Sequence, residues 1–149
     1  VVFGLWLFIE KRSANPQKYA VPASAAKRAR FGSKTMAYPG RILLFFIIYH
    51  LITFKYGAEY TVSYDGVEMR DLFRLMVEVF QQPAYVVGYV VCLILLGIHL
   101  SHGFSSAFQT LGVNHPSYNC TIRKVGWVYA IVVAAGFISQ PLYIFLMNS

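Results

Sequence analysis

The chain carries little charge for its length. Of its 149 residues, 13% are charged, whereas 57% are hydrophobic and 17% are aromatic. This composition excludes an ordinary soluble domain, in which about 25% of residues are charged, and predicts an integral membrane protein. The net charge of +7 would suggest nucleic-acid binding in a soluble chain, but the basic residues gather in one loop, which is typical of membrane topology. We therefore expect no nucleic-acid partner.

Cysteine is also scarce. Cys92 falls within an apolar stretch and Cys120 in a polar loop, and there is no CxxC motif. Because these two residues are expected at different depths, neither a disulfide nor a cysteine metal site is indicated. The sequence also lacks a nucleophile paired with a base, a phosphate-binding loop, paired acids and metal-ligand spacing. Hydrolytic and group-transfer chemistry are therefore not supported.

Long apolar stretches are present instead. Residues 36–54, 85–108 and 125–147 are each predicted to form a membrane-spanning helix, which requires roughly 20 apolar residues. Residues 1–9 are apolar but too few to cross a bilayer, so we expect them to be the end of another helix. Pro141 is expected to kink the last span. The predicted fold class is an all-α transmembrane helix bundle that forms a single domain, with about three and a half helices present.

The charges orient these helices. Between Glu10 and Thr35 there are seven basic residues and one acid, so this loop is expected on the cytoplasmic side. The connection 55–83 is net acidic and is expected outside. Within it, Asp65 followed by Glu68 has the spacing of a helix N-cap, and apolar residues then recur at helical spacing. An amphipathic surface helix is therefore predicted over residues 66–82.

Two histidines lie inside the apolar stretches. A titratable imidazole at hydrocarbon depth is a metal or haem ligand, a proton relay or a polar contact between helices. His50 is expected near the outer end of its span and His99 roughly 20 Å from the outer start of the next one. One haem cannot easily be held by both, so haem ligation would require two haems, each with a second axial ligand from elsewhere. A hydrogen bond between helices is the structural alternative for each histidine.

Neighbouring residues are weaker candidates. Gly103, one turn after His99, leaves the same helix face without a side chain where a flat macrocycle could pack, although small residues also serve plain helix contacts. His102 is a candidate donor to a haem propionate or a quinone carbonyl, with a wet interfacial side chain as the equal alternative. His115 in a polar loop is expected to be solvated or part of a subunit contact.

The segment HLSHGFSSAFQTLGVNHPSY, residues 99–118, resembles the cytochrome b558-type membrane anchor of succinate dehydrogenase and fumarate reductase. Three further segments are similar to that family, so the resemblance covers nearly the whole chain: EKRSANPQKYA, SKTMAYPGRILLFFIIYHL and RDLFRLMVEVFQQPAYVVGYV. The resemblance implies a bundle of five transmembrane helices that binds two b-type haems. This chain would supply the end of the second helix and all of the third, fourth and fifth.

By this resemblance His50 would be an iron ligand of the outer, distal haem and His99 of the inner, proximal haem. His99 is preferred to His102 because the family pattern places a glycine four residues after the ligand, here Gly103. Lys55 and His102 are candidate contacts for a propionate or a quinone.

The resemblance also implies an electron-transfer subunit of respiratory complex II, in the tricarboxylic acid cycle. Its expected partners are a flavoprotein subunit that oxidises succinate, an iron-sulfur subunit, membrane lipid and a quinone of the menaquinone type. Its expected location is the bacterial cytoplasmic membrane, as a multi-pass protein. Two alternatives stay open: another dihaem cytochrome of the nitrate-reductase or b561 type, which would lack the run from Ser106 to Gly112, and a cofactor-free anchor or transporter.

Overall fold

A computed structural model of the chain describes Trp6, Glu10 and residues 36–113 and 115–147. The elements in order are α3 (Ala37–Phe54), β1 (Thr61–Tyr64), β2 (Val67–Arg70), α4 (Leu72–Phe80), α5 (Pro83–Thr110) and α6 (Pro116–Met147). They all belong to one compact unit, Lys34–Ser149. The expected helix end at residues 1–9 and the basic loop that follows lie outside the described residues, apart from Trp6 and Glu10.

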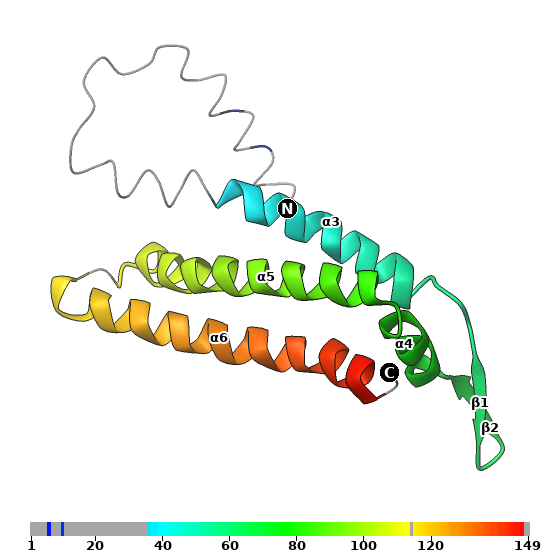
Figure 1. Ribbon diagram of the computed structural model, residues 1–149. Helices are drawn as coiled ribbons and strands as arrows, with labels where there is room; N and C mark the ends of the chain where they lie inside the picture. The colour runs from blue at the N-terminus through cyan, green and yellow to red at the C-terminus, as the bar shows by residue number, and fades with distance from the viewer. Residues whose placement is uncertain (1–5, 7–9, 11–35, 114, 148–149) are drawn as a thin grey trace. The chain divides into compact units, whose positions relative to one another are not determined.

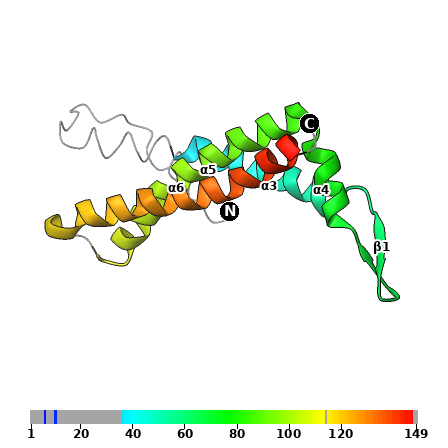
Figure 2. The same cartoon turned by 60° about the horizontal axis from the view of Figure 1, so that its bottom comes forward.

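Three helices, α3, α5 and α6, are long and apolar enough to cross a membrane. At about 1.5 Å per residue, α5 and α6 exceed the roughly 30 Å of a bilayer's hydrocarbon core, so their ends project beyond it. α5 runs antiparallel to α3 and to α6 and packs most extensively against α6 (Figures 1 and 2). The described part of the chain is thus mainly helical, as predicted for a membrane-spanning bundle.

Small residues allow α5 and α6 to approach closely. A Cβ added at Gly97 would lie 3.1 Å from the Cβ of Ala134, and one added at Gly126 would lie 2.9 Å from the ring of Phe104. Such contacts replace the hydrophobic driving force that helices lack inside lipid. The core at the other end of the helix pair is aromatic and aliphatic, and its buried members are Phe80, Val86, Tyr89 and Ile144.

The predicted surface helix over residues 66–82 is wrong in its first part. Residues 61–70 form an antiparallel hairpin in which Tyr64 pairs with Val67. Asp65 and Gly66 form its turn with φ values of 48° and 80°, the left-handed pair that a two-residue hairpin turn requires and that Asp-Gly supplies. Asp65 is therefore a turn residue and not a helix cap. The cap is Asp71, whose carboxylate accepts a bond of 2.9 Å from the backbone N–H of Arg74, and α4 begins one residue later.

The last helix begins at Pro116, nine residues before the predicted start of the third span at residue 125. Proline is well suited to a first helical position because the N–H it lacks would be unbonded there. His115 completes the start: its Nδ1 accepts from the backbone N–H of Ser117 at 3.2 Å, and its own N–H donates to the side chain of Asn119 at 3.1 Å. Pro141 lies inside this helix, which continues beyond it to Met147. The other two spans match their predicted limits to within two residues.

Candidate functional site

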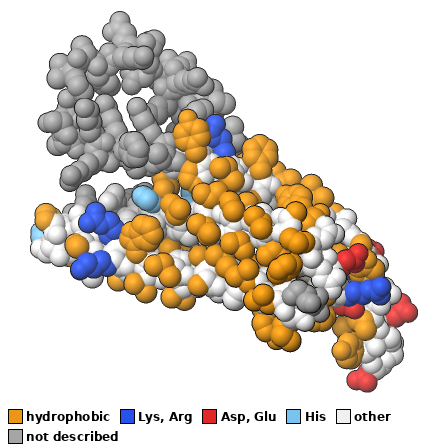
Figure 3. Space-filling view, in the orientation of Figure 1, with side chains coloured by type: hydrophobic (Ala, Val, Ile, Leu, Met, Phe, Trp, Pro, Cys, Tyr) orange, Lys and Arg blue, Asp and Glu red, His pale blue; other side chains and the backbone are white. Residues whose placement is uncertain are grey.

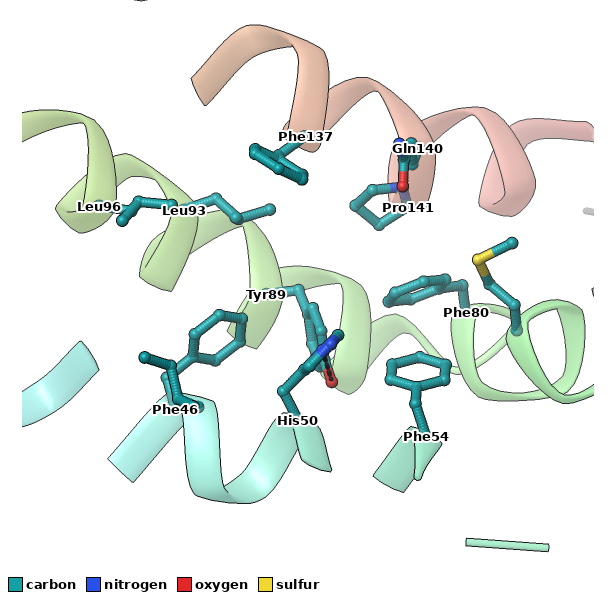
Figure 4. A pocket seen from close by; sticks show the side chains of 12 residues that line it. Phe46, His50, Phe54, Phe80, Tyr89, Leu93, Leu96, Phe137, Gln140 and Pro141 are labelled. Atoms are coloured by element: carbon teal, nitrogen blue, oxygen red, sulfur yellow. Dashed lines mark hydrogen bonds between the residues drawn. The ribbon is translucent and has the colours of Figure 1, made fainter. Parts of the chain in front are cut away.

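His50 lies on the face of α3 that meets α5 and α4, among aromatic rings (Figure 4). Its ring centroid is 5.1 Å from that of Phe54, 6.0 Å from Tyr89 and 6.1 Å from Phe46. The hydroxyl of Tyr89 lies 3.5 Å from Nδ1 of His50. Tyr89 is buried, whereas part of the His50 ring is exposed. The imidazole is thus held from one side and accessible from another.

A cavity of about 260 Å³ opens beside this ring. Its walls come from α3, α4, α5 and α6, and they include Phe46 and His50 from α3, Phe80 from α4, Tyr89 from α5, and Gln140 and Pro141 from α6 (Figure 4). Polar atoms are few, so the cavity offers an apolar space with the His50 imidazole at its edge. Its volume is below the roughly 300–1,000 Å³ of pockets that enclose a typical organic ligand. A larger group could contact His50 only from the exposed side of the ring.

His99 lies on α5 where that helix passes the start of α3. A Cβ added at Gly40 would lie 3.3 Å from Cε1 of His99 and 4.0 Å from Nδ1, so a side chain at residue 40 would crowd the imidazole. Nδ1 is buried and has no hydrogen-bond partner among the described residues. Since the Nδ1–Cε1 edge of the ring faces Gly40, the opposite edge, which carries Cδ2, faces away from α3.

The two histidines belong to separate levels of the same helix pair. His99 on α5 meets Gly40 on α3, and His50 on α3 meets Tyr89 on α5. These two contacts are ten residues apart on each helix, which corresponds to about 15 Å along the helix axes. The described structure therefore does not bring His50 and His99 together, in keeping with the different depths expected from the sequence.

The weaker candidates lie apart from these two rings. His102 is exposed, and its Nδ1 lies 3.2 Å from the carbonyl of Ile98; because a carbonyl can only accept, Nδ1 carries the proton and donates. Gly103 is exposed, and a Cβ added there would meet nothing within 4 Å. Lys55 is at the C-cap of α3 with its Nζ 5.4 Å from the Tyr56 ring, and it does not line the cavity beside His50.

Sequence reasoning missed three residues that position this region. Gly40 and Tyr89 face the two histidines, but a glycine and a tyrosine in apolar helices give no local signal of that contact. The third is Arg70 at the end of β2, whose guanidinium donates to the carbonyls of Lys55 at 2.9 Å, Ala58 at 3.3 Å and Gly57 at 3.4 Å. It thereby holds the chain just after the helix that carries His50, where carbonyls at a helix C-terminus favour a cation.

Chemically, each histidine offers one imidazole to an external group. Within the part of the chain that the structure describes, no group of three or more His, Cys, Asp and Glu side chains could hold a metal ion. Axial ligation of a haem needs only one imidazole from each side of the ring plane, and the described residues fit that demand in part. His50 is exposed and a Cβ at Gly103 would meet nothing within 4 Å, whereas Nδ1 of His99 is buried on the side that faces Gly40.

In comparisons with known proteins, no family model, no curated protein and no solved structure matches this chain.

Proposed function

We propose that this chain is the dihaem cytochrome b membrane anchor of a succinate:quinone oxidoreductase. The observation that carries the proposal is the placement of His50 and His99 at two levels of one helix pair, about 15 Å apart along the axes. Two one-electron sites at different depths are what transfer of electrons across a membrane requires. The resemblance of residues 99–118 to the cytochrome b558-type anchors supports the same function and implies a five-helix bundle.

In this proposal His50 would hold the outer haem and His99 the inner one, each with a second axial ligand from a helix beyond those described. A b-type haem, when bound, supplies reversible one-electron chemistry at its iron. The chain's own contribution is orientation and burial. The hydroxyl oxygen of Tyr89, 3.5 Å from Nδ1 of His50, would accept a hydrogen bond from Nδ1–H and so fix the ring, as hydrogen-bond partners of ligating histidines commonly do. Gly40 would leave the His99 ring its space.

The partners follow from the same proposal. A flavoprotein subunit would oxidise succinate, an iron-sulfur subunit would pass the electrons on, and a quinone of the menaquinone type would take them from the anchor. The basic loop before α3 would be the docking surface on the cytoplasmic side of a bacterial inner membrane, by the excess of Lys and Arg there. Lys55, at the outer end of α3, remains a candidate contact for an anionic or carbonyl group.

The test is a dithionite-reduced minus oxidised visible spectrum of the purified complex with its full-length anchor. We expect two b-type haems in the parent and the loss of one in each of His50→Ala and His99→Ala. His115→Ala is the control, because it removes an exposed histidine that has no expected contact with a haem and should leave both haems. Two haems in both ligand variants would contradict the assignment.

A cofactor-free anchor is the second candidate. The contact between Tyr89 and His50 favours it, because a hydrogen bond between two helices is by itself a structural role for a histidine. A colourless parent complex that still contains the flavoprotein and iron-sulfur subunits would replace the dihaem proposal with this one.

A further inference from the structure

A second, polar cavity lies between the end of α5 and the start of α6. Its volume is about 230 Å³. The residues around it include Ser105 and Gln109 from α5 and Asn119, Cys120, Ile122 and Arg123 from α6. Unlike the cavity beside His50, it combines a guanidinium, two amides and a hydroxyl in one small space. None of these residues takes part in the proposed electron transfer.

The packing of the two helices places this cavity next to their close contact. A Cβ at Gly126 would lie 2.9 Å from Phe104, and the Phe104 ring also packs against Phe108 at 5.0 Å and Tyr129 at 5.6 Å. Towards the loop that joins the helices, this apolar contact gives way to polar side chains. Gln109 lies about one turn after Phe104 on α5, and Arg123 about one turn before Gly126 on α6. The cavity therefore lies near a tight aromatic contact between the two helices.

The charge of this cavity is not balanced within the helix pair. No Asp or Glu follows Glu78 in the sequence, so neither α5 nor α6 contains a carboxylate that could neutralise Arg123. The acidic side chains of the described unit gather at the opposite end, on and around the hairpin (Figure 3). A guanidinium favours a bidentate anion such as a carboxylate or a phosphate. The anion for Arg123 would thus come from outside the helix pair.

The surroundings of Arg123 match the depth of lipid headgroups. Exposed Tyr118 and Trp127 lie on the same helix, before and after Arg123, and such aromatic side chains mark the membrane interface. Ile122 and exposed Val125 add apolar surface beside the guanidinium. By the excess of basic residues, this end of the helices faces the cytoplasm, where basic pockets between membrane helices bind anionic lipid headgroups.

We propose that this cavity binds the phosphate of an anionic phospholipid. Arg123 pairs with the phosphate oxygens, the amide of Gln109 donates to the same headgroup, and the acyl chains lie along the apolar surface below Ile122. This site is independent of haem and of the proposed function. It would be occupied in an anchor that carries no cofactor.

The test measures retention of dioleoyl phosphatidylglycerol by the purified full-length protein in neutral detergent, by native mass spectrometry, against dioleoyl phosphatidylcholine. We expect the parent to prefer phosphatidylglycerol, and Arg123→Gln to weaken its binding about tenfold, the effect of one charge-assisted hydrogen-bonding group. Lys124→Gln is the matched control, because it removes the same charge from the next residue, which does not line the cavity. It should leave binding nearly unchanged.

Two further arms complete the test. Gln109→Leu keeps every charge and removes one donor, so a smaller loss of phosphatidylglycerol binding is expected. Addition of inorganic phosphate should not displace the lipid; displacement at millimolar concentration would show that the site takes soluble phosphate and would overturn the lipid assignment. Equal losses in Arg123→Gln and Lys124→Gln would overturn the site itself, because they would show a diffuse attraction to basic charge. The absence of a preference for phosphatidylglycerol in the parent would also overturn the site.

Discussion

At Gly40 the absence of a side chain decides how close α3 comes to the imidazole of His99. The ring has a buried nitrogen without a described partner, and a methyl group at residue 40 would come within 3.3 Å of its Cε1 atom. A contact of that length forces the ring or the helix to move by a few tenths of an ångström. His50 is held differently, by the Tyr89 hydroxyl and by aromatic rings on either side. The two imidazoles thus depend on different kinds of neighbour.

We expect Gly40→Ala to disturb His99 without unfolding the protein. Alanine usually stabilises a helix by about 0.5–1 kcal/mol relative to glycine, and crowding of the imidazole should cancel this gain. Gly136→Ala is the control, since a Cβ there meets nothing within 4 Å, and it should keep the gain. Thermal unfolding in detergent measures the difference. By the proposed function, Gly40→Ala should also alter the spectrum of one haem only, and an unchanged spectrum would contradict its role beside His99.

Among the elements, the hairpin of β1 and β2 depends most on contacts outside itself. Two strands of four residues are marginally stable on their own. The hairpin is attached to α3 through Arg70 and to α4 through Tyr60, whose hydroxyl donates to the carboxylate of Glu78. The guanidinium of Arg74 also lies 4.3 Å from the centroid of the Tyr60 ring. These contacts hold the connection between α3 and α5 in one arrangement.

The Tyr60 contact predicts a dependence on alkaline pH. Its hydrogen bond to Glu78 raises the pKa of Tyr60 above 10.0 because the bond requires the protonated phenol. The stabilisation is therefore fully present below the ordinary tyrosine pKa and is lost as the pH rises through the raised value. Subtracting the ultraviolet titration of Tyr60→Phe from that of the parent should isolate one phenol with a raised pKa. The Glu78→Gln variant should titrate it at lower pH, and an identical curve would disprove the assigned cause.

At the scale of the whole unit, the charges are divided between its two ends. Acidic side chains surround the hairpin, whereas the connection between α5 and α6 is followed by Arg123 and Lys124 (Figure 3). The excess of basic residues predicts that the latter end lies on the cytoplasmic side. Cys120 is exposed at that end, and Cys92 is half-buried within α5.

This orientation predicts from which side of the membrane the thiol of Cys120 can be labelled. A membrane-impermeant maleimide should label Cys120 in inverted membrane vesicles and should not label it in intact spheroplasts, because only the former expose the cytoplasmic end. Mass spectrometry of the labelled peptide identifies the site, and Cys120→Ser provides the blank. Labelling in intact spheroplasts would reverse the orientation and with it the location of the polar cavity.

The apolar stretches predicted the three spanning helices well because length and hydropathy alone determine them. The hairpin was missed because Asp65 and Glu68 have cap spacing, although Asp-Gly between β-branched and aromatic residues is also a hairpin signal. The apolar stretch predicts α6 only from residue 125 because Arg123 and Lys124 interrupt the hydrophobic pattern, whereas a helix can continue past the hydrocarbon into water. The partners of His50 and His99 depend on the register between α3 and α5, which no local pattern encodes.

The two histidine contacts lie ten residues apart on α3 and ten residues apart on α5. Both contacts therefore require a fixed number of residues between them on each helix. Insertion of one residue between Gly40 and His50 would rotate the remainder of α3 by about 100° and shift it by about 1.5 Å. His50 would then turn away from Tyr89 while Gly40 still faced His99. A single insertion in α5 between Tyr89 and His99 would not restore both contacts, because it would rotate these two residues relative to each other by about 100° about the axis of α5. This stretch should therefore accept many substitutions but no insertion or deletion.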